Sequence, residues 1–191
     1  MTARIAWTYE NYAALPDDGK RYEVHAGELV MTPAPGSDHQ VVLMRLLQVL
    51  ARHVEAHDLG LVLPAPLDVI LSEDPRETTV VEPDIVYLAV DRLPTLRRRG
   101  VVGSPTLVVE ILSPGTAATD RGTKRSLYAR YGVPHYWIVD LDNRALESYV
   151  LRGAEYHSAV RASGASPIDV PPFVGLGLVP TSLWPPFPIL P

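Results

Sequence analysis

The sequence predicts an α/β (α+β) fold in which a mixed central sheet is flanked by helices and preceded by an N-terminal β-hairpin. Two observations lead to this prediction. Two segments place apolar residues at helical spacing, and three strand-like apolar segments lie between them. The resulting order of helix, three strands, helix and strand pair is typical of a sheet that carries helices on its faces.

Length and composition limit the kinds of protein that this chain can be. We expect one domain over residues 1–191, with its core at about 21–150, because a chain of this length buries a sizeable core. The absence of cysteine excludes disulfides and thiolate metal sites. No secretory signal and no segment long enough to span a bilayer are recognisable, so we expect a cytoplasmic protein without a membrane partner. The net charge of -5 argues against a non-specific nucleic-acid binder, but not against an enzyme with a local basic cleft.

The first elements are expected in the N-terminal half of the chain. Residues 21–31 predict a hairpin that turns at Ala26-Gly27. Residues 39–57 predict a helix with Ser37 or Asp38 as its cap. Strands are expected at 61–71, 80–90 and 106–112. The third is apolar on both faces, which is typical of a central, covered strand.

The C-terminal half is expected to complete the sheet. Residues 119–131 predict a second helix, with Thr119 or Asp120 as cap and Gly132 as its end. Residues 135–151 predict two strands joined at Asp142-Asn143, and Tyr136 and Trp137 in the first of them are expected in the core. The Pro/Gly-rich tail, 163–191, is expected to pack on the domain, because apolar side chains such as Leu183, Trp184 and Phe187 are costly to expose.

Two carboxylates interrupt apolar strands. Glu110 lies inside LVVEIL, where an ionised side chain is costly unless it is paired or binds a cation. The alternative is a structural glutamate paired with an arginine. Asp84 follows Pro83 among apolar residues, and the alternative there is a turn residue at the start of a strand.

Lys124 lies on the helix face that is expected to meet the sheet, together with Leu127, Tyr128 and Tyr131. Asp84 and Glu110 can bind Mg²⁺ or Mn²⁺ through oxygen ligands, and a metal-bound water is a good nucleophile. A nearby lysine can stabilise charge on a phosphate in the transition state. These three residues therefore indicate phosphodiester hydrolysis. The alternative for Lys124 is a side chain that reaches solvent near the helix start.

The same segments resemble a known family. Pro83-Asp84 followed by Glu110 and a helix resembles the PD-(D/E)XK nuclease superfamily. The segments RYEVHAGELV, VEPDIVYL and LVVEILSPGTAATDRGTKRSLYARYGVPHYWIVD are similar to the Uma-two family, over about residues 8–150. This resemblance implies a restriction-endonuclease-like core. The usual lysine position of the superfamily, two residues after the glutamate, is Leu112 here, and the family resemblance implies that Lys124 takes its role.

Further residues are weaker candidates. The resemblance implies Glu23 as an additional acid that orients a water or a second metal, and the alternative is a solvated hairpin residue. We expect His39 either to contact substrate or assist at the site, or to be a helix histidine whose hydrogen bonds are satisfied within the protein. The main-chain carbonyl of Ile111 is expected to complete the metal ligands. Asp68 is either a third acid or an edge residue.

A set of arginines is expected to form a basic patch that follows phosphates, with a solvated charged surface as the alternative. They are Arg92, Arg97, Arg98, Arg99, Arg121, Arg125 and Arg130.

The leading hypothesis is a metal-dependent endonuclease acting on DNA, expected by analogy to be a homodimer because a duplex has two strands. A second hypothesis is a nuclease-like fold that binds nucleic acid or a protein without cutting. A third is a metal-dependent hydrolase of another phosphoester.

Overall fold

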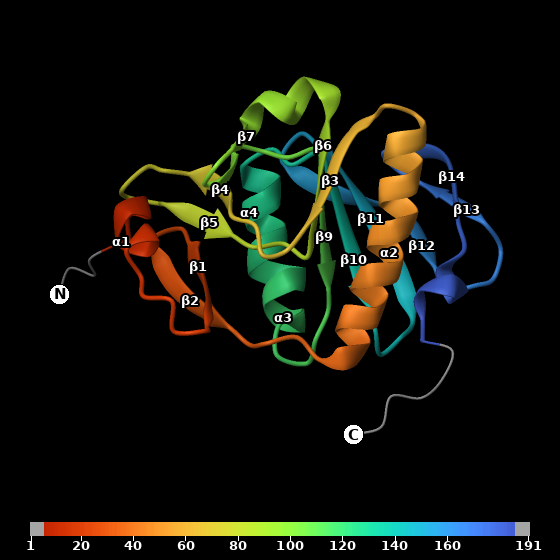
Figure 1. Cartoon of the computed structure of the whole chain (residues 1–191), viewed down its shortest axis with the longest axis horizontal. Coiled ribbons are helices and arrows are strands. Elements are labelled where there is room, and N and C mark those ends of the chain that lie inside the picture. Colours follow the sequence, from red (N-terminus) through yellow and green to blue (C-terminus); the bar gives the residue numbers. More distant parts are fainter. Residues whose placement is uncertain (1–5, 186–191) are drawn as a thin grey trace.

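The computed structural model describes residues 6–185, and a six-stranded mixed sheet forms its centre (Figure 1). The strands lie in the order β12 (Glu155–Ala162), β11 (Ala145–Arg152), β10 (His135–Asp140), β9 (Leu107–Ile111), β6 (Ile85–Ala89) and β3 (Gly60–Pro64). Only β9 and β10 are parallel, with Glu110 opposite Ile138. The predicted fold class is confirmed, and so is the central, fully buried position of the third predicted strand.

A second six-stranded sheet, which we call the N-terminal sheet, carries the hairpin. Its order is β2 (Glu28–Thr32), β1 (Arg21–His25), β5 (Thr79–Val81), β4 (Val69–Ser72), β8 (Gly100–Val102) and β7 (Leu96–Arg97). The hairpin is confirmed, with Ala26 and Gly27 at positive φ in its turn. The short helix α1 (Tyr9–Ala13) precedes it, and the 3-10 helix η1 (Val90–Thr95) precedes β7.

The prediction of single strands at 61–71 and 80–90 was wrong, because each segment is divided between the two sheets. The first forms β3 and then β4, and the second forms β5 and then β6. Proline explains both divisions, since Pro64 ends β3, Pro66 lies in the first break and Pro83 lies in the second, and proline has no N–H for a sheet ladder. The second break places Asp84 immediately before β6.

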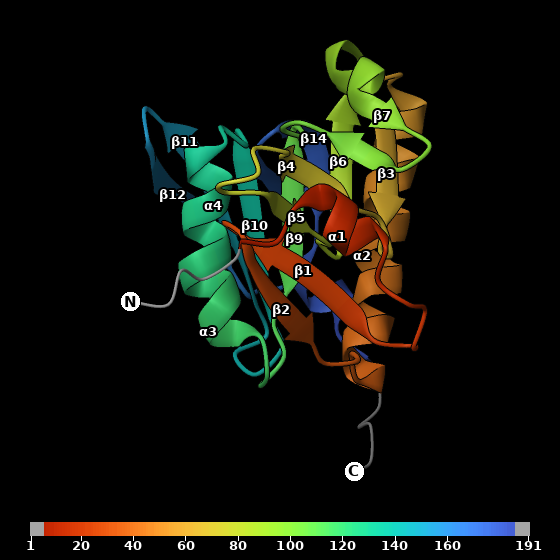
Figure 2. The ribbon, with the colours of Figure 1, turned by 90° about the vertical axis from the view of Figure 1, so that its left-hand side faces the viewer.

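Helices cover both faces of the central sheet, as the views of Figures 1 and 2 show. The long helix α2 (Ser37–Ala56) lies on one face, and its N-cap is Gly36 rather than Ser37 or Asp38. On the other face, α3 (Ala117–Thr119), a π-helical turn (Asp120–Lys124) and α4 (Arg125–Arg130) form one continuous helix.

The cap predicted for this second helix, Thr119 or Asp120, was wrong. The helix begins at Ala117, two residues before the predicted start at about 119, after a turn in which Ser113 O accepts hydrogen bonds from Thr116 N and Ala117 N. Asp120 is therefore a buried residue of the helix interior and not a cap. The predicted end holds, because Gly132 follows at φ 71°, a conformation that glycine adopts without strain.

Two apolar clusters correspond to the two faces of the sheet. Leu46 and Leu50 of α2 pack with Trp137 of β10 in the first cluster, and Tyr128 of α4 packs with Tyr136 in the second. Tyr136 and Trp137 are both fully buried, which confirms their predicted place in the core.

The C-terminal segment contributes to the first of these clusters. After β12 come β13 (Ile168–Val170), β14 (Phe173–Leu178) and the 3-10 helix η3 (Pro180–Leu183). Phe173, Leu183 and Trp184 are buried there, and Trp137 donates its indole N–H to Pro171 O at 2.7 Å. Phe187 lies outside the described residues.

Candidate active site

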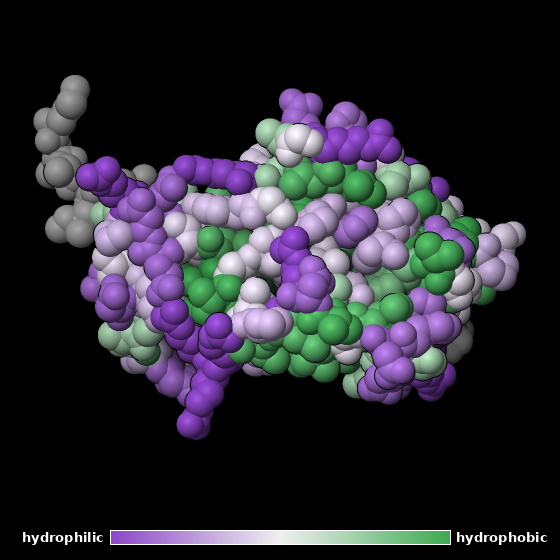
Figure 3. Space-filling model, turned by 90° about the horizontal axis from the view of Figure 1, so that it is seen from above, coloured by the Kyte–Doolittle hydropathy of each residue, from purple (hydrophilic) through white to green (hydrophobic). Residues whose placement is uncertain are grey.

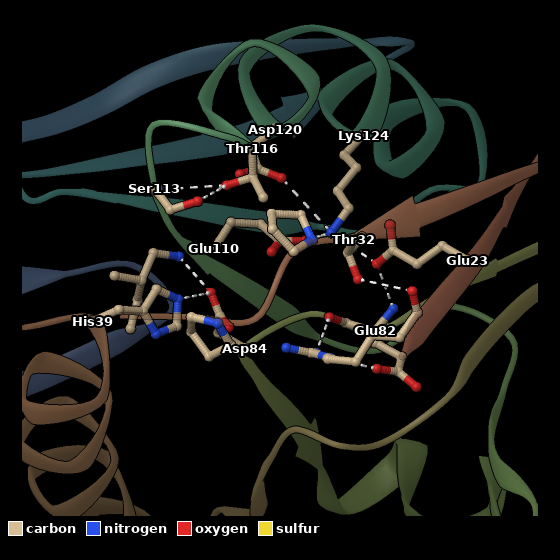
Figure 4. A pocket seen from close by; sticks show the side chains of 14 residues that line it. Glu23, Thr32, His39, Glu82, Asp84, Glu110, Ser113, Thr116, Asp120 and Lys124 are labelled. Atoms are coloured by element: carbon tan, nitrogen blue, oxygen red, sulfur yellow. Dashed lines mark hydrogen bonds and ion pairs between the residues drawn. The ribbon is translucent and has the colours of Figure 1, made fainter. Parts of the chain in front are cut away.

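A small pocket collects the predicted site residues from elements that are far apart in the sequence (Figure 4). Its volume is about 30 Å³, enough for about one or two water-sized occupants. Its ionisable side chains come from strand β1, the junction before β6, strand β9, the first turn of α2 and the π-helical turn. These are Arg21, Glu23, His39, Glu82, Asp84, Glu110, Asp120 and Lys124.

Asp84 is held by the neighbouring strand and by the first helix. Its Oδ2 accepts the amide N–H of Ile111 at 2.7 Å and lies 3.1 Å from Nε2 of His39. Both Asp84 and His39 are buried, and the His39 Nδ1 has no hydrogen-bond partner among residues 6–185. Because β6 and β9 are adjacent, the residue before β6 meets the end of β9. Ile111 therefore takes part through its N–H, and a role for its carbonyl stays a prediction.

Glu110 and Lys124 form a buried pair between β9 and the helix. Lys124 Nζ lies 3.1 Å from Glu110 Oε1, and the hydroxyl of Tyr128 donates to the same oxygen at 2.5 Å. Burial raises the pKa of Glu110, and Asp120 and the other carboxylates of the pocket add to this effect against the attraction of Lys124.

Glu23 is the acid that the resemblance implied in the N-terminal region, and it is fully buried. Its Oε1 lies 2.9 Å from Lys124 Nζ and accepts the Glu82 amide N–H at 2.8 Å, while Oε2 lies 2.8 Å from His25 Nε2. Burial raises the pKa of Glu23, but Lys124 and these hydrogen bonds outweigh burial and lower it to about 2. The solvated-hairpin alternative is excluded.

Lys124 remains a cation in this setting. Burial lowers its pKa, but the nearby charges of Glu110, Glu23 and Asp120 raise it far more, so the net shift is upward. The alternative in which Lys124 reaches solvent is wrong, because Lys124 is 4 % exposed and its side chain points into the pocket.

Sequence reasoning missed Asp120, which it treated as a possible cap. Asp120 is 2 % exposed, lines the pocket and has its Oδ1 3.6 Å from Lys124 Nζ. The π-helical turn contains both residues, and such turns are frequent at functional sites. Burial and neighbouring carboxylates raise the pKa of Asp120. Its spacing of four residues before Lys124 was the signal available in the sequence.

Asp68 lies outside the pocket. Its Oδ1 accepts the hydroxyl of Tyr12 at 2.7 Å, so it links α1 to the N-terminal sheet. Burial raises the pKa of Asp68. The alternative of a third acid at the site is not supported by this placement.

Comparison with known proteins gives a family and a fold. The sequence model of the Uma2 family, described as "putative restriction endonuclease", matches residues 9–182. The chain belongs to the Uma2 family. A crystal structure of a putative nuclease belonging to DUF820 from Anabaena variabilis ATCC 29413 has a similar fold, with a TM-score of 0.70 and 17% identity over 93% of this chain and 97% of that one. A search of curated proteins found no match. Membership in Uma2 supports a nuclease-like function.

A divalent cation fits the pocket of this Uma2 chain. The described lining residues include five carboxyl groups and two permanent cations, so oxygen ligands for a cation outnumber the positive charges. Asp84 makes its contacts through Oδ2 and Glu110 through Oε1, which leaves a second oxygen on each. Within residues 6–185 no group of three or more acidic or histidine side chains forms a metal cage. Mg²⁺ needs no such cage, since it commonly binds one or two carboxylates together with water and phosphate.

The predicted arginine patch is largely engaged within the Uma2 fold. Arg121 forms ion pairs with both Asp140 and Glu147. Arg99 forms a bidentate ion pair with Glu73. Arg130 pairs with Glu77. Seen from above, hydrophilic side chains form several groups, one of them on the side of the N-terminal sheet, with apolar side chains between these groups (Figure 3). A phosphate-tracking role for these arginines stays a prediction. No helix among the described residues is long and apolar enough to cross a bilayer.

Proposed function

We propose that this protein is a metal-dependent endonuclease that hydrolyses phosphodiester bonds in DNA, with Asp84, Glu110 and Lys124 at its reaction centre. The observation that carries the proposal is that two buried carboxylates, one immediately before β6 and one in the neighbouring strand β9, line the same pocket as a buried lysine from a helix. Family membership supports a nuclease-like activity, and the metal and the DNA substrate are the proposed part.

In this proposal Asp84 and Glu110 would hold Mg²⁺ or Mn²⁺. Asp84 presents one oxygen while Ile111 N–H and His39 fix the other, so its orientation is set before a cation arrives. When bound, the cation would supply Lewis-acid activation of a water and of the phosphate. His39 acts by orienting Asp84.

Lys124 serves as a fixed positive charge. Because its pKa is raised by three surrounding carboxylates, it stays protonated at neutral pH and does not act as a general base. An ammonium in this position can stabilise the charge that develops on phosphate oxygens during the reaction. Glu23 and Asp120 hold the ammonium in place from two further sides.

The test is nicking of supercoiled plasmid by the purified protein in Mn²⁺, in Mg²⁺ and in EDTA. Asp84→Asn and Lys124→Met are measured beside Lys20→Met, which changes the only other lysine, 55 % exposed at its side chain. We expect nicking that requires metal, is unchanged in Lys20→Met, and falls by about 10² or more in the two site variants.

Nicking that is absent in the wild type, or that persists unchanged in both site variants, would overturn the proposal. Binding of an oligonucleotide without any cleavage would then favour a nuclease-like binding protein. Hydrolysis of a small phosphate diester without plasmid nicking would favour a different phosphoester substrate. The homodimer stays a prediction, which sedimentation equilibrium tests.

A further inference from the structure

We infer that Tyr128 is a positioning residue, whose hydroxyl and the Lys124 ammonium together hold one oxygen of Glu110 and leave the other oxygen for the cation. This inference rests on the proposed metal-dependent function. It assigns Tyr128 no contact with substrate or metal, since its hydroxyl acts through Glu110.

The hydroxyl of Tyr128 has an unusual partner for its location. The side chain is fully buried in the apolar cluster between α4 and the central sheet, where a phenylalanine ring would fill the same space. Two other buried tyrosines of that cluster donate to main-chain carbonyls, Tyr136 to Asp120 O at 3.0 Å and Tyr156 to Val133 O at 2.7 Å. Tyr128 instead donates to a pocket carboxylate, Glu110 Oε1, at 2.5 Å.

Helical spacing brings the two donors to the same atom. Lys124 and Tyr128 are four residues apart, so their side chains lie one above the other on the helix face that meets β9. Both reach Oε1 of Glu110, at 3.1 and 2.5 Å. Two donors on one oxygen fix the rotation of the carboxylate, and no hydrogen bond from residues 6–185 engages Oε2.

Rotation of this carboxylate matters because outer hydrogen bonds orient a metal ligand. Loss of such a partner typically weakens metal affinity by about 10–100-fold. Lys124 alone would hold Glu110 less firmly, because its ammonium is also paired with Glu23 and Asp120. The hydroxyl therefore supplies the contact that is specific to Glu110.

The experiment compares Tyr128→Phe with Tyr156→Phe as a matched control, because each variant removes one buried hydroxyl from the same cluster. The dissociation constant for Mn²⁺ is measured by calorimetry, and the fold is checked by circular dichroism. We expect Tyr128→Phe to fold and to bind Mn²⁺ about 10-fold more weakly, and Tyr156→Phe to stay within about twofold of the wild type.

A double-mutant cycle separates positioning from packing. In a Glu110→Gln background, Tyr128→Phe should change Mn²⁺ affinity by less than about twofold, because the carboxylate through which it acts is gone. Plasmid nicking by Tyr128→Phe should recover toward the wild-type rate at saturating Mn²⁺, which a packing defect would not produce.

Equal Mn²⁺ affinity in wild type and Tyr128→Phe would overturn the inference, as would an unfolded Tyr128→Phe chain or an undiminished effect in the Glu110→Gln background. Failure of the proposed function looks different, because a wild type that binds Mn²⁺ but nicks no plasmid contradicts the nuclease proposal alone.

Discussion

Lys124 Nζ lies 3.1 Å from Glu110 Oε1, although the two residues come from a helix and a strand. In the superfamily pattern the lysine would follow the glutamate on the same strand, at the position of Leu112. Here the helix that follows β9 packs on the central sheet, and its Lys124 lies beside the same carboxylate. The pair therefore depends on the packing of the helix against the sheet, and so does the proposed chemistry.

Replacement of Lys124 by methionine should destabilise the protein strongly. The change leaves the buried Glu23 and Glu110 without their cation, and breaking a buried pair typically costs about 3–5 kcal/mol. Lys20→Met removes only an exposed pair with Asp18 and should leave the urea midpoint close to that of the wild type. Urea unfolding in EDTA at pH 8 measures both, and equal losses would contradict the account.

The stability difference between wild type and Lys124→Met should depend on pH. The pKa of Glu23 is about 2 in the folded protein, below the value of about 4.3 for an unperturbed glutamate. Its contribution is therefore complete above about pH 4.3 and is lost as the pH falls toward 2. Urea midpoints should converge over this range, and a constant difference would show that Glu23 is not the partner that matters.

Asp84→Asn should abolish metal binding with little loss of stability. The amide oxygen of asparagine can still accept the Ile111 N–H, but the charge that attracts a cation is gone. We expect Mn²⁺ binding to be lost in calorimetry, and the free energy of unfolding to change by about 1 kcal/mol or less. Asp91→Asn, at an exposed position, is the control. Wild-type Mn²⁺ affinity in Asp84→Asn would contradict the assignment.

Two substitutions of His39 should distinguish the effect of its hydrogen bond to Asp84 from the effect of its packing. His39→Gln retains a donor that can reach Asp84 and should keep much of the nicking rate, whereas His39→Leu should lose about 10-fold or more. Equal rates for the two variants would indicate that His39 has only a packing role.

The contribution of Arg121 to the free energy of unfolding should decrease as the pH falls into the acid range. Its hydrogen bonds lower the pKa of Glu147, and the pKa of Asp140 is also lowered, because hydrogen bonds from Asn143 and Arg121 outweigh burial. This stabilisation is present above about pH 4 and is lost as the pH falls. Arg121 is partly exposed, so we expect only about 1 kcal/mol or less from it. Arg121→Gln should flatten the fall in urea midpoint between about pH 5 and 3, and an unchanged slope would contradict this.

The sequence predicted the parts of the fold that follow from local pattern. The hairpin at Ala26-Gly27, the apolar strand around Glu110 and the long helix before Leu59 all carry strong periodicity or turn residues. The division of strands between two sheets was missed, because strand pairing over long separations leaves no local periodic signal. Prolines at 64, 66 and 83 marked the breaks but not the partners.

Residues of the candidate site could be predicted where a charged side chain occupies a position that the pattern predicts to be apolar. Glu110 and Lys124 were noticed because charged residues occupied positions expected to be apolar. Asp120 was missed because an aspartate near a helix start is usually a cap, and only the earlier helix start and the π-helical turn make it a pocket residue. Tyr128 was on the predicted inward face, but its hydrogen bond to Glu110 depends on tertiary packing.

Mn²⁺ dependence of nicking, measured beside direct Mn²⁺ binding on the same preparation, tests the central claim most directly. If Asp84 and Glu110 hold the catalytic cation, the metal concentration for half-maximal nicking should match the calorimetric dissociation constant within about threefold, and Glu110→Gln should weaken both. Nicking that saturates while the pocket binds no Mn²⁺, or Mn²⁺ binding weakened in Glu110→Gln without any loss of nicking, would contradict the account.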